Sequence, residues 1–194
     1  MVARYDRAMQ SSRPLLVVVS GAPASGKTTL AQRLAADGAL TLLSKDAIKE
    51  ALADSLGHPE TVDASGTLGT GAYAAMFAMA ARLVESGTSI GLESNFRRGR
   101  AEPDLARLAG IADPRVVHCV ADAPTIRRRY EARAPERHAA HLDAARRKDV
   151  MRELRGGLYD PLDLGWPLAV VRTDDGYAPA YDEIRTFALG RRSG

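Results

Sequence analysis

One short segment, residues 21–28, limits the possible folds of this chain more than any other feature. It reads Gly-Ala-Pro-Ala-Ser-Gly-Lys-Thr and matches G-x-x-x-x-G-K-[ST] at every fixed position. Residues 15–20 are apolar and β-branched without alternation, which favours a central parallel strand buried on both faces. Residues 27–37 carry apolar side chains at helical spacing, and Gly38 follows them. The sequence therefore predicts a loop that joins a buried strand to a helix.

A loop in this position is suited to binding phosphate groups. Its glycines let the backbone curl so that successive N–H groups and the helix N-terminus face a phosphate. Lys27 is expected to reach the β- and γ-phosphates with an exposed ammonium, and the Thr28 hydroxyl to hold Mg²⁺. No Asn-Lys-x-Asp guanine motif occurs, which favours ATP and leaves GTP possible as the donor. The expected nucleotide-binding residues of the loop are Gly21, Ala22, Pro23, Ala24, Ser25, Gly26, Lys27, Thr28 and Thr29.

Further strands and helices alternate along the rest of the chain. Strands are predicted over residues 39–43, 88–94, 115–121 and 168–173. Helices are predicted over residues 46–56, 71–85, 103–108, 125–134, 142–154 and 181–189, with a loop over residues 58–70. This alternation predicts an α/β fold with a five-stranded parallel sheet in the order 2-3-1-4-5 and helices on both faces.

Length and composition exclude several classes of protein. The chain has 194 residues, of which 45% are hydrophobic and 26% charged, as in an ordinary single globular domain. The longest nearly apolar stretch spans 11 residues (71–81), whereas a membrane helix needs about 18. The lone Cys119 excludes a disulfide framework and a cysteine-based zinc site. The apolar run near the N-terminus is too short for a signal peptide, so a cytoplasmic protein is expected.

The segment 20–29, Ser-Gly-Ala-Pro-Ala-Ser-Gly-Lys-Thr-Thr, resembles the phosphate loop of the small P-loop kinases. This group includes chloramphenicol phosphotransferase, gluconate kinase and the 5′-hydroxyl polynucleotide kinases, and the likeness in order and spacing runs from about residue 15 to residue 173. The resemblance implies a P-loop NTPase fold and transfer of a γ-phosphate to a hydroxyl group. We expect a flexible N-terminal arm (1–13), followed by a single P-loop kinase domain (14–194).

The resemblance assigns roles to two carboxylates. Asp46 lies 19 residues after Lys27, where kinases of this group place the base that acts on the acceptor; it is also a candidate Mg²⁺ ligand. The alternative for Asp46 is a helix N-cap. Glu93 is expected at the end of the third strand, where it would hold Mg²⁺ or position the acceptor, because a charged group in a buried strand is costly unless it is used.

Three residues near these carboxylates are candidate contacts of the acceptor. Lys49 follows Asp46 by three positions, where related polynucleotide kinases carry a basic residue; a solvated helix position is the alternative. Asn95 and Arg97 follow the third strand, although most arginines of the 97–100 segment fit a solvated loop in a chain this rich in arginine.

Residues 122–155 form the most basic segment, with nine arginines and one lysine against six acidic residues. A basic helical lid is predicted here, because an arginine supplied from a lid stabilises the charge that spreads over the γ-phosphate. Arg129 and Arg133 have the spacing that family members place in the lid, and they share one helix face. His138 and His141 have no carboxylate nearby at metal-ligand spacing, so we interpret both as lid or surface residues.

Thr173 and Asp174 follow the fifth strand, in a loop that lies against the nucleotide base in many P-loop kinases. An ordinary turn before the last helix is the alternative.

Three functions remain open on this sequence. The first is an ATP- or GTP-dependent phosphotransferase acting on a small molecule, such as an antibiotic or a sugar-like acceptor. The second is a 5′-hydroxyl nucleic-acid kinase. Against it, the chain has only ten aromatic residues that could stack on bases, and a net charge of +3 is too small to indicate nucleic-acid binding by itself. The third is a regulatory ATPase that binds nucleotide without a small acceptor. A monomer or a homodimer without a membrane partner is expected in each case.

Overall fold

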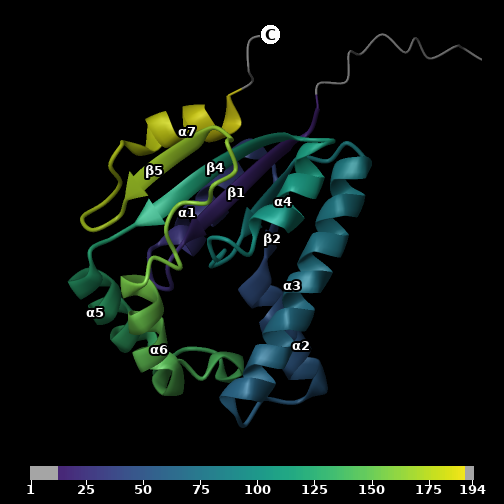
Figure 1. Cartoon of the computed structure of the whole chain (residues 1–194). Coiled ribbons are helices and arrows are strands. Elements are labelled where there is room, and N and C mark those ends of the chain that lie inside the picture. Colours follow the sequence, from purple (N-terminus) through teal and green to yellow (C-terminus); the bar gives the residue numbers. More distant parts are fainter. Residues whose placement is uncertain (1–12, 191–194) are drawn as a thin grey trace, which may run out of the picture.

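The computed structural model describes residues 13–190 of the chain (Figure 1). Of the expected flexible arm, residues 1–12 lie outside the described residues, as do residues 191–194. In chain order the elements are β1 (Leu15–Gly21), α1 (Lys27–Gly38), β2 (Thr41–Ser44), α2 (Lys45–Leu56), α3 (Val62–Glu85), β3 (Ile90–Glu93), α4 (Glu102–Ala109), β4 (Asp113–Val120), α5 (Ala123–Arg133), the 3₁₀ turn η1 (Ala139–His141), α6 (Asp143–Arg155), β5 (Leu168–Arg172) and α7 (Tyr181–Leu189).

A five-stranded sheet in the order β2-β3-β1-β4-β5 forms the centre of the molecule, which confirms the predicted topology. All neighbouring strands are parallel, and β1 lies between β3 and β4. Because parallel strands end at the same edge, the segments that follow β1, β2 and β3 meet there. The register brings Val19 of β1 opposite Glu93 of β3, and Glu93 opposite Ser44 of β2.

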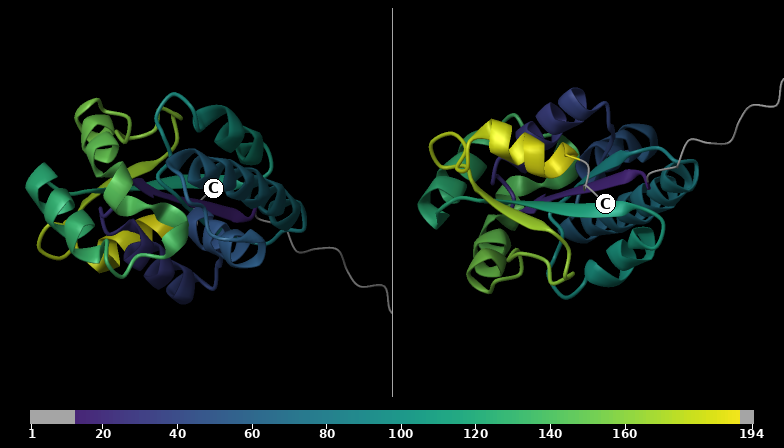
Figure 2. Two further views of the ribbon diagram at one scale, coloured as in Figure 1. Left: turned by 90° about the horizontal axis from the view of Figure 1, so that it is seen from below. Right: turned by 90° about the horizontal axis from the view of Figure 1, so that it is seen from above.

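Each face of the sheet is covered by its own group of helices (Figure 2). Successive residues of β1 point to opposite faces. Leu16 and Val18 pack with α3 and α4, whereas Val17 and Val19 pack with α1 and α7. Burial on both sides explains why the strand is apolar throughout.

The predicted loop over residues 58–70 is wrong from residue 62 onward, because α3 begins at Val62. Thr61 caps this helix by accepting a hydrogen bond from the Ala64 N–H. Glycine, serine and threonine in its first turns suggested a loop, but Ser65 is buried there and α3 packs along α2. Tertiary packing thus outweighs weak helix propensity in these turns.

The basic segment folds into α5, η1 and α6 at the carboxyl ends of the strands (Figure 1). In the view of Figure 1 these elements face the lower parts of α2 and α3. None of the helices within residues 13–190 combines the length and the apolar character that crossing a bilayer would require.

Candidate functional site

The phosphate loop has a backbone that few residue types adopt. Gly21 and Gly26 have φ angles of 143° and 81°, and Ala24 has a φ of 64°. A side chain at Gly21 would overlap the carbonyl oxygen of Cys119 in β4. An alanine in the left-handed region is strained, as is common where a loop is shaped for a ligand. The loop therefore has the curled form that directs backbone N–H groups inward.

Lys27 lies at the start of α1 and is buried, with 4% of its surface exposed. This corrects the expectation of an exposed ammonium. Its Nζ lies 3.6 Å from Oε1 of Glu93 and 3.5 Å from the carbonyl oxygen of Ala22. Glu93 is equally buried at the end of β3, so the pair neutralises two charges that would be costly alone.

Two hydroxyl groups complete the surroundings of Glu93. The Thr28 hydroxyl donates to Oε1 at 3.2 Å and the Ser44 hydroxyl donates to Oε2 at 2.6 Å. Mg²⁺ in phosphate sites prefers one or two carboxylates, a hydroxyl and phosphate oxygens. The hydroxyl of Thr28 and the carboxylate of Glu93, which lie against each other, are groups of the kind that bind such an ion.

Asp46 stands in the first turn of α2, but it is not the cap of that helix. Ser44 is the N-cap and accepts a hydrogen bond from the Ala47 N–H, so the capping alternative for Asp46 is wrong. The Asp46 carboxylate accepts hydrogen bonds from Lys45 at 3.2 Å and from Arg137 at 2.7 Å. Burial would raise the pKa of Asp46, but the charges of Lys45, Lys27 and Arg137 outweigh it and hold the pKa well below its usual range.

A cavity of about 790 Å³ opens beside Asp46 at the carboxyl edge of the sheet. Its walls come from the phosphate loop (Pro23), from the start of α2, from the first turns of α3, from the segment after β3 and from the lid. The segment after β3 carries the predicted acceptor contacts Asn95 and Arg97. Residues 62–70, predicted as part of a loop, line the cavity as the first turns of α3.

Lys49 lies in this cavity with 3% of its surface exposed, so the solvated alternative is wrong. Its Nζ donates to the Ser65 hydroxyl at 2.6 Å, and no ion pair joins it to a carboxylate within residues 13–190. Burial, and then repulsion from Lys45, lowers the pKa of Lys49 to about 8. A buried ammonium that is paired with no carboxylate within residues 13–190 favours a ligand that accepts hydrogen bonds or carries negative charge.

Asn95 and Arg97 also line the cavity. The Asn95 Oδ1 atom is buried and has no hydrogen-bond partner among the described residues. Arg97 pairs with Glu153 of α6 at 3.1 Å, so part of its charge is used within the protein.

The two predicted lid arginines point to different places. Arg133 lines the cavity and pairs with Asp143 at 3.0 Å. Arg129 instead donates to the carbonyl oxygens of Thr173 and Asp174, at 2.6 and 3.0 Å. The Thr173 hydroxyl donates in turn to the Ser25 carbonyl oxygen of the phosphate loop, at 2.8 Å. Arg129 thus contacts the loop after β5, which in turn contacts the phosphate loop, whereas Arg133 lies at the cavity.

A family model described as AAA domain (AAA_33) matches residues 16–156. The chain belongs to this AAA domain family. A protein from Chloroflexus aurantiacus J-10-fl, provisionally described as a kinase, is 34% identical; the match covers 91% of this chain and 97% of that chain, with a TM-score of 0.80. Together with the phosphate loop, these relationships place the chain in a P-loop kinase-like, nucleotide-binding phosphotransferase family.

Two more distant structures share the fold of this AAA domain. Kti12 of Chaetomium thermophilum, in complex with ADP-AlF3, is 22% identical with a TM-score of 0.60, over 91% of this chain and 100% of that chain. A gluconokinase from Sinorhizobium meliloti 1021 is 16% identical with a TM-score of 0.51, over 91% of this chain and 90% of that chain. No curated protein sequence matches the chain.

Sequence reasoning missed three side chains that the AAA domain places around the cavity: Lys45, Arg137 and His141. Arg137 continues the four-residue spacing of Arg129 and Arg133, a signal that could have been extended, although α5 ends at Arg133. His141 hydrogen-bonds to Glu50 at 2.8 Å, and burial lowers its pKa to about 3, so the imidazole is neutral. Glu50 lies 91 positions away, beyond the reach of any local spacing rule.

Proposed function

We propose that this chain transfers the γ-phosphate of ATP to a hydroxyl group of a small, polar acceptor. The observation that carries the proposal is the position of the Asp46 carboxylate. It lines a cavity of about 790 Å³ that is also lined by Pro23 of the phosphate loop. A hydroxyl compound in the cavity would therefore lie between a carboxylate and the bound nucleotide, as phosphoryl transfer requires.

Each side chain has a defined part in this proposal. The phosphate loop and Lys27 bind the phosphates, and Arg129 with Thr173 and Asp174 supports the nucleotide side. Thr28, Glu93 and Asp46 would hold Mg²⁺, which neutralises charge on the phosphate oxygens. Asp46 orients the acceptor hydroxyl by accepting its hydrogen bond. A carboxylate whose pKa is lowered is a weak proton acceptor, so orientation is its larger contribution.

The lining of the cavity supports a polar acceptor. Lys45, Lys49, Arg100 and Asp63 lie in it. The side-chain oxygen of Asn95, which has no hydrogen-bond partner within residues 13–190, lies there as well. When a ligand displaces water from these groups, the ligand must offer hydrogen bonds in place of those to water, or binding is weakened. A compound with several hydroxyl or anionic groups meets this need better than an aromatic, largely apolar antibiotic. We therefore favour a sugar-like acceptor over a chloramphenicol-like one.

The test is a turnover screen with ATP, GTP and Mg²⁺ against three classes of acceptor: polyols and sugars, aromatic antibiotics, and 5′-hydroxyl oligonucleotides. Formation of the phosphorylated product from a sugar-like compound, lost in Asp46→Asn, is the expected result. Turnover of the oligonucleotide, with affinity that falls steeply as salt rises, would support a nucleic-acid kinase instead. Nucleotide hydrolysis that no acceptor accelerates would support a regulatory ATPase.

A further inference from the structure

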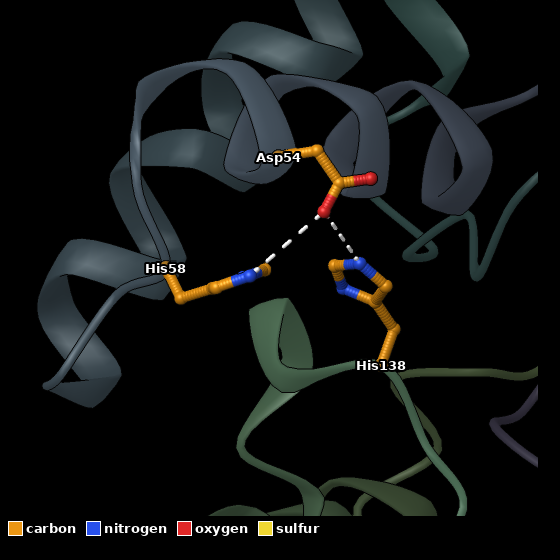
Figure 3. A group of neighbouring side chains, drawn as sticks. All are labelled: Asp54, His58 and His138. Carbon is orange, nitrogen blue, oxygen red and sulfur yellow. Dashed lines mark hydrogen bonds and ion pairs between the residues drawn. The ribbon is translucent and has the colours of Figure 1, made fainter.

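Two histidines and one carboxylate converge where the lid meets the end of α2 (Figure 3). Asp54 belongs to α2, His58 to the segment after it, and His138 to the lid segment just before η1. Their donor atoms all lie within 4.8 Å of one another. The Asp54 Oδ1 atom is 3.1 Å from Nε2 of His138 and 3.9 Å from Nε2 of His58.

We propose that Asp54, His58 and His138 bind a divalent transition-metal ion, of which Zn²⁺ is the best candidate, and that this ion fastens the lid to α2. Two imidazole nitrogens and one carboxylate oxygen suit Zn²⁺, Co²⁺ or Ni²⁺, whereas Mg²⁺ prefers oxygen ligands. In a tetrahedral zinc site with bonds near 2.1 Å, ligand atoms lie about 3.4 Å apart. The distances from Asp54 need changes of only a few tenths of an ångström to reach that value.

Because of the position of these three residues, a bound ion would link the lid to α2. Asp46, Glu50 and Asp54 follow one another at four-residue spacing on α2, so they form one stripe along the helix. The lid contacts all three members, through Arg137 at 2.7 Å, His141 at 2.8 Å and His138 at 3.1 Å. An ion bound by Asp54 and His138 would strengthen the third of these contacts. None of the three ligands lines the acceptor cavity, so the metal site is separate from it.

Binding would change two hydrogen bonds of His138. Its Nδ1 atom accepts a hydrogen bond from the Ala140 N–H, so in the neutral imidazole Nε2 carries the proton and donates to Asp54. Metal binding through Nε2 would replace the bond to Asp54 and leave the proton on Nδ1, so the Ala140 N–H would turn to water. His58 and Asp54 are more than half exposed, so little rearrangement of the fold opposes binding.

Metal binding is tested directly on the tag-free chain, because a histidine tag would itself bind these ions. Titration with Zn²⁺ and with Co²⁺, in excess Mg²⁺ and without nucleotide, should show one site. The d–d absorption of Co²⁺ reports its coordination. Asp54→Ala, His58→Ala and His138→Ala should each weaken binding at least about tenfold. Asp182→Ala removes an exposed carboxylate of α7 and should bind as the wild type does. Absence of a site in the wild type, or unchanged binding in the three variants, overturns the proposal.

Whether the ion holds the lid against α2 is measured separately, by limited proteolysis. Trypsin cleaves after Arg137, next to His138, so the rate of cleavage there reports how firmly the lid is held. Zn²⁺ should slow this cleavage several-fold in the wild type and in Asp182→Ala. It should have no effect in Asp54→Ala and His58→Ala, whose cleavage site is unaltered. Equal protection in these two variants, or none in the wild type, overturns the role of the ion in holding the lid.

Discussion

Asp46 is the residue on which the proposed reaction depends most. Asp46→Asn keeps the shape of the side chain, and the α2 cap is unaffected because Ser44 provides it. We expect kcat to fall about 10²-fold, within the range for loss of a positioned acid–base group. The nucleotide Kd should change little, since in the proposed complex most contacts with the phosphates come from Lys27 and the loop backbone. Acceptor-dependent turnover is measured beside nucleotide binding, and intact turnover would remove Asp46 from the reaction.

Lys49 should make acceptor binding depend on pH. Its pKa of about 8 means that the ammonium is charged below pH 8 and becomes neutral as the pH rises through that value. If this charge holds the acceptor, KM for the acceptor should be constant below pH 8 and should rise above it.

The control is Lys49→Arg, which stays charged throughout and should flatten the profile. KM for the nucleotide should show no such step in either protein. A wild-type profile that matches that of the arginine variant would show that Lys49 does not contact the acceptor.

At the scale of secondary structure, the ion pair of Lys27 and Glu93 joins the start of α1 to the end of β3. Lys27→Ala should abolish phosphoryl transfer, and because both partners are buried it should also lower stability. Breaking such a pair costs about 3 kcal/mol or more, since one buried charge loses its partner. The double variant Lys27→Ala/Glu93→Gln should recover part of that loss. Urea unfolding of both variants measures it, and equal stabilities would show that Glu93 is not penalised by the missing lysine.

The elements that could be predicted from the sequence are those with strong local patterns. The apolar run of β1 and the motif after it predicted both the strand and its central place, because the phosphate loop must lie at the middle of the sheet edge. The prediction was wrong for the first turns of α3, because their glycines and threonines form a helix only through packing against α2. The contact of His138 was not predicted for a related reason, because its carboxylate partner, Asp54, lies 84 positions away in the sequence.

At the scale of the whole molecule, the site depends on contacts between segments that are far apart in the chain. Thr173 and Ser25 are separated by 148 positions, yet their hydrogen bond joins the loop after β5 to the phosphate loop. Arg129 of α5 donates a hydrogen bond to Thr173 and so joins the lid to these two loops. The sheet order made this neighbourhood predictable in outline. The partner of each arginine was not predictable, because it depends on how the lid docks.

Arg129→Ala should therefore weaken nucleotide binding, because the loop after β5 would be held less firmly against the phosphate loop. The variant loses hydrogen bonds to Thr173 and Asp174, and with them the support of the loop that contacts Ser25. One to two net hydrogen bonds correspond to about 1.4 kcal/mol, so the nucleotide Kd should rise about tenfold. Arg127→Ala is the matched control, because Arg127 lies on the same helix and pairs only with Glu131 at the surface among the described residues. Calorimetric titration of ADP into both variants makes the comparison. If the two variants bind ADP equally, the contacts of Arg129 with the loop after β5 do not contribute to nucleotide binding.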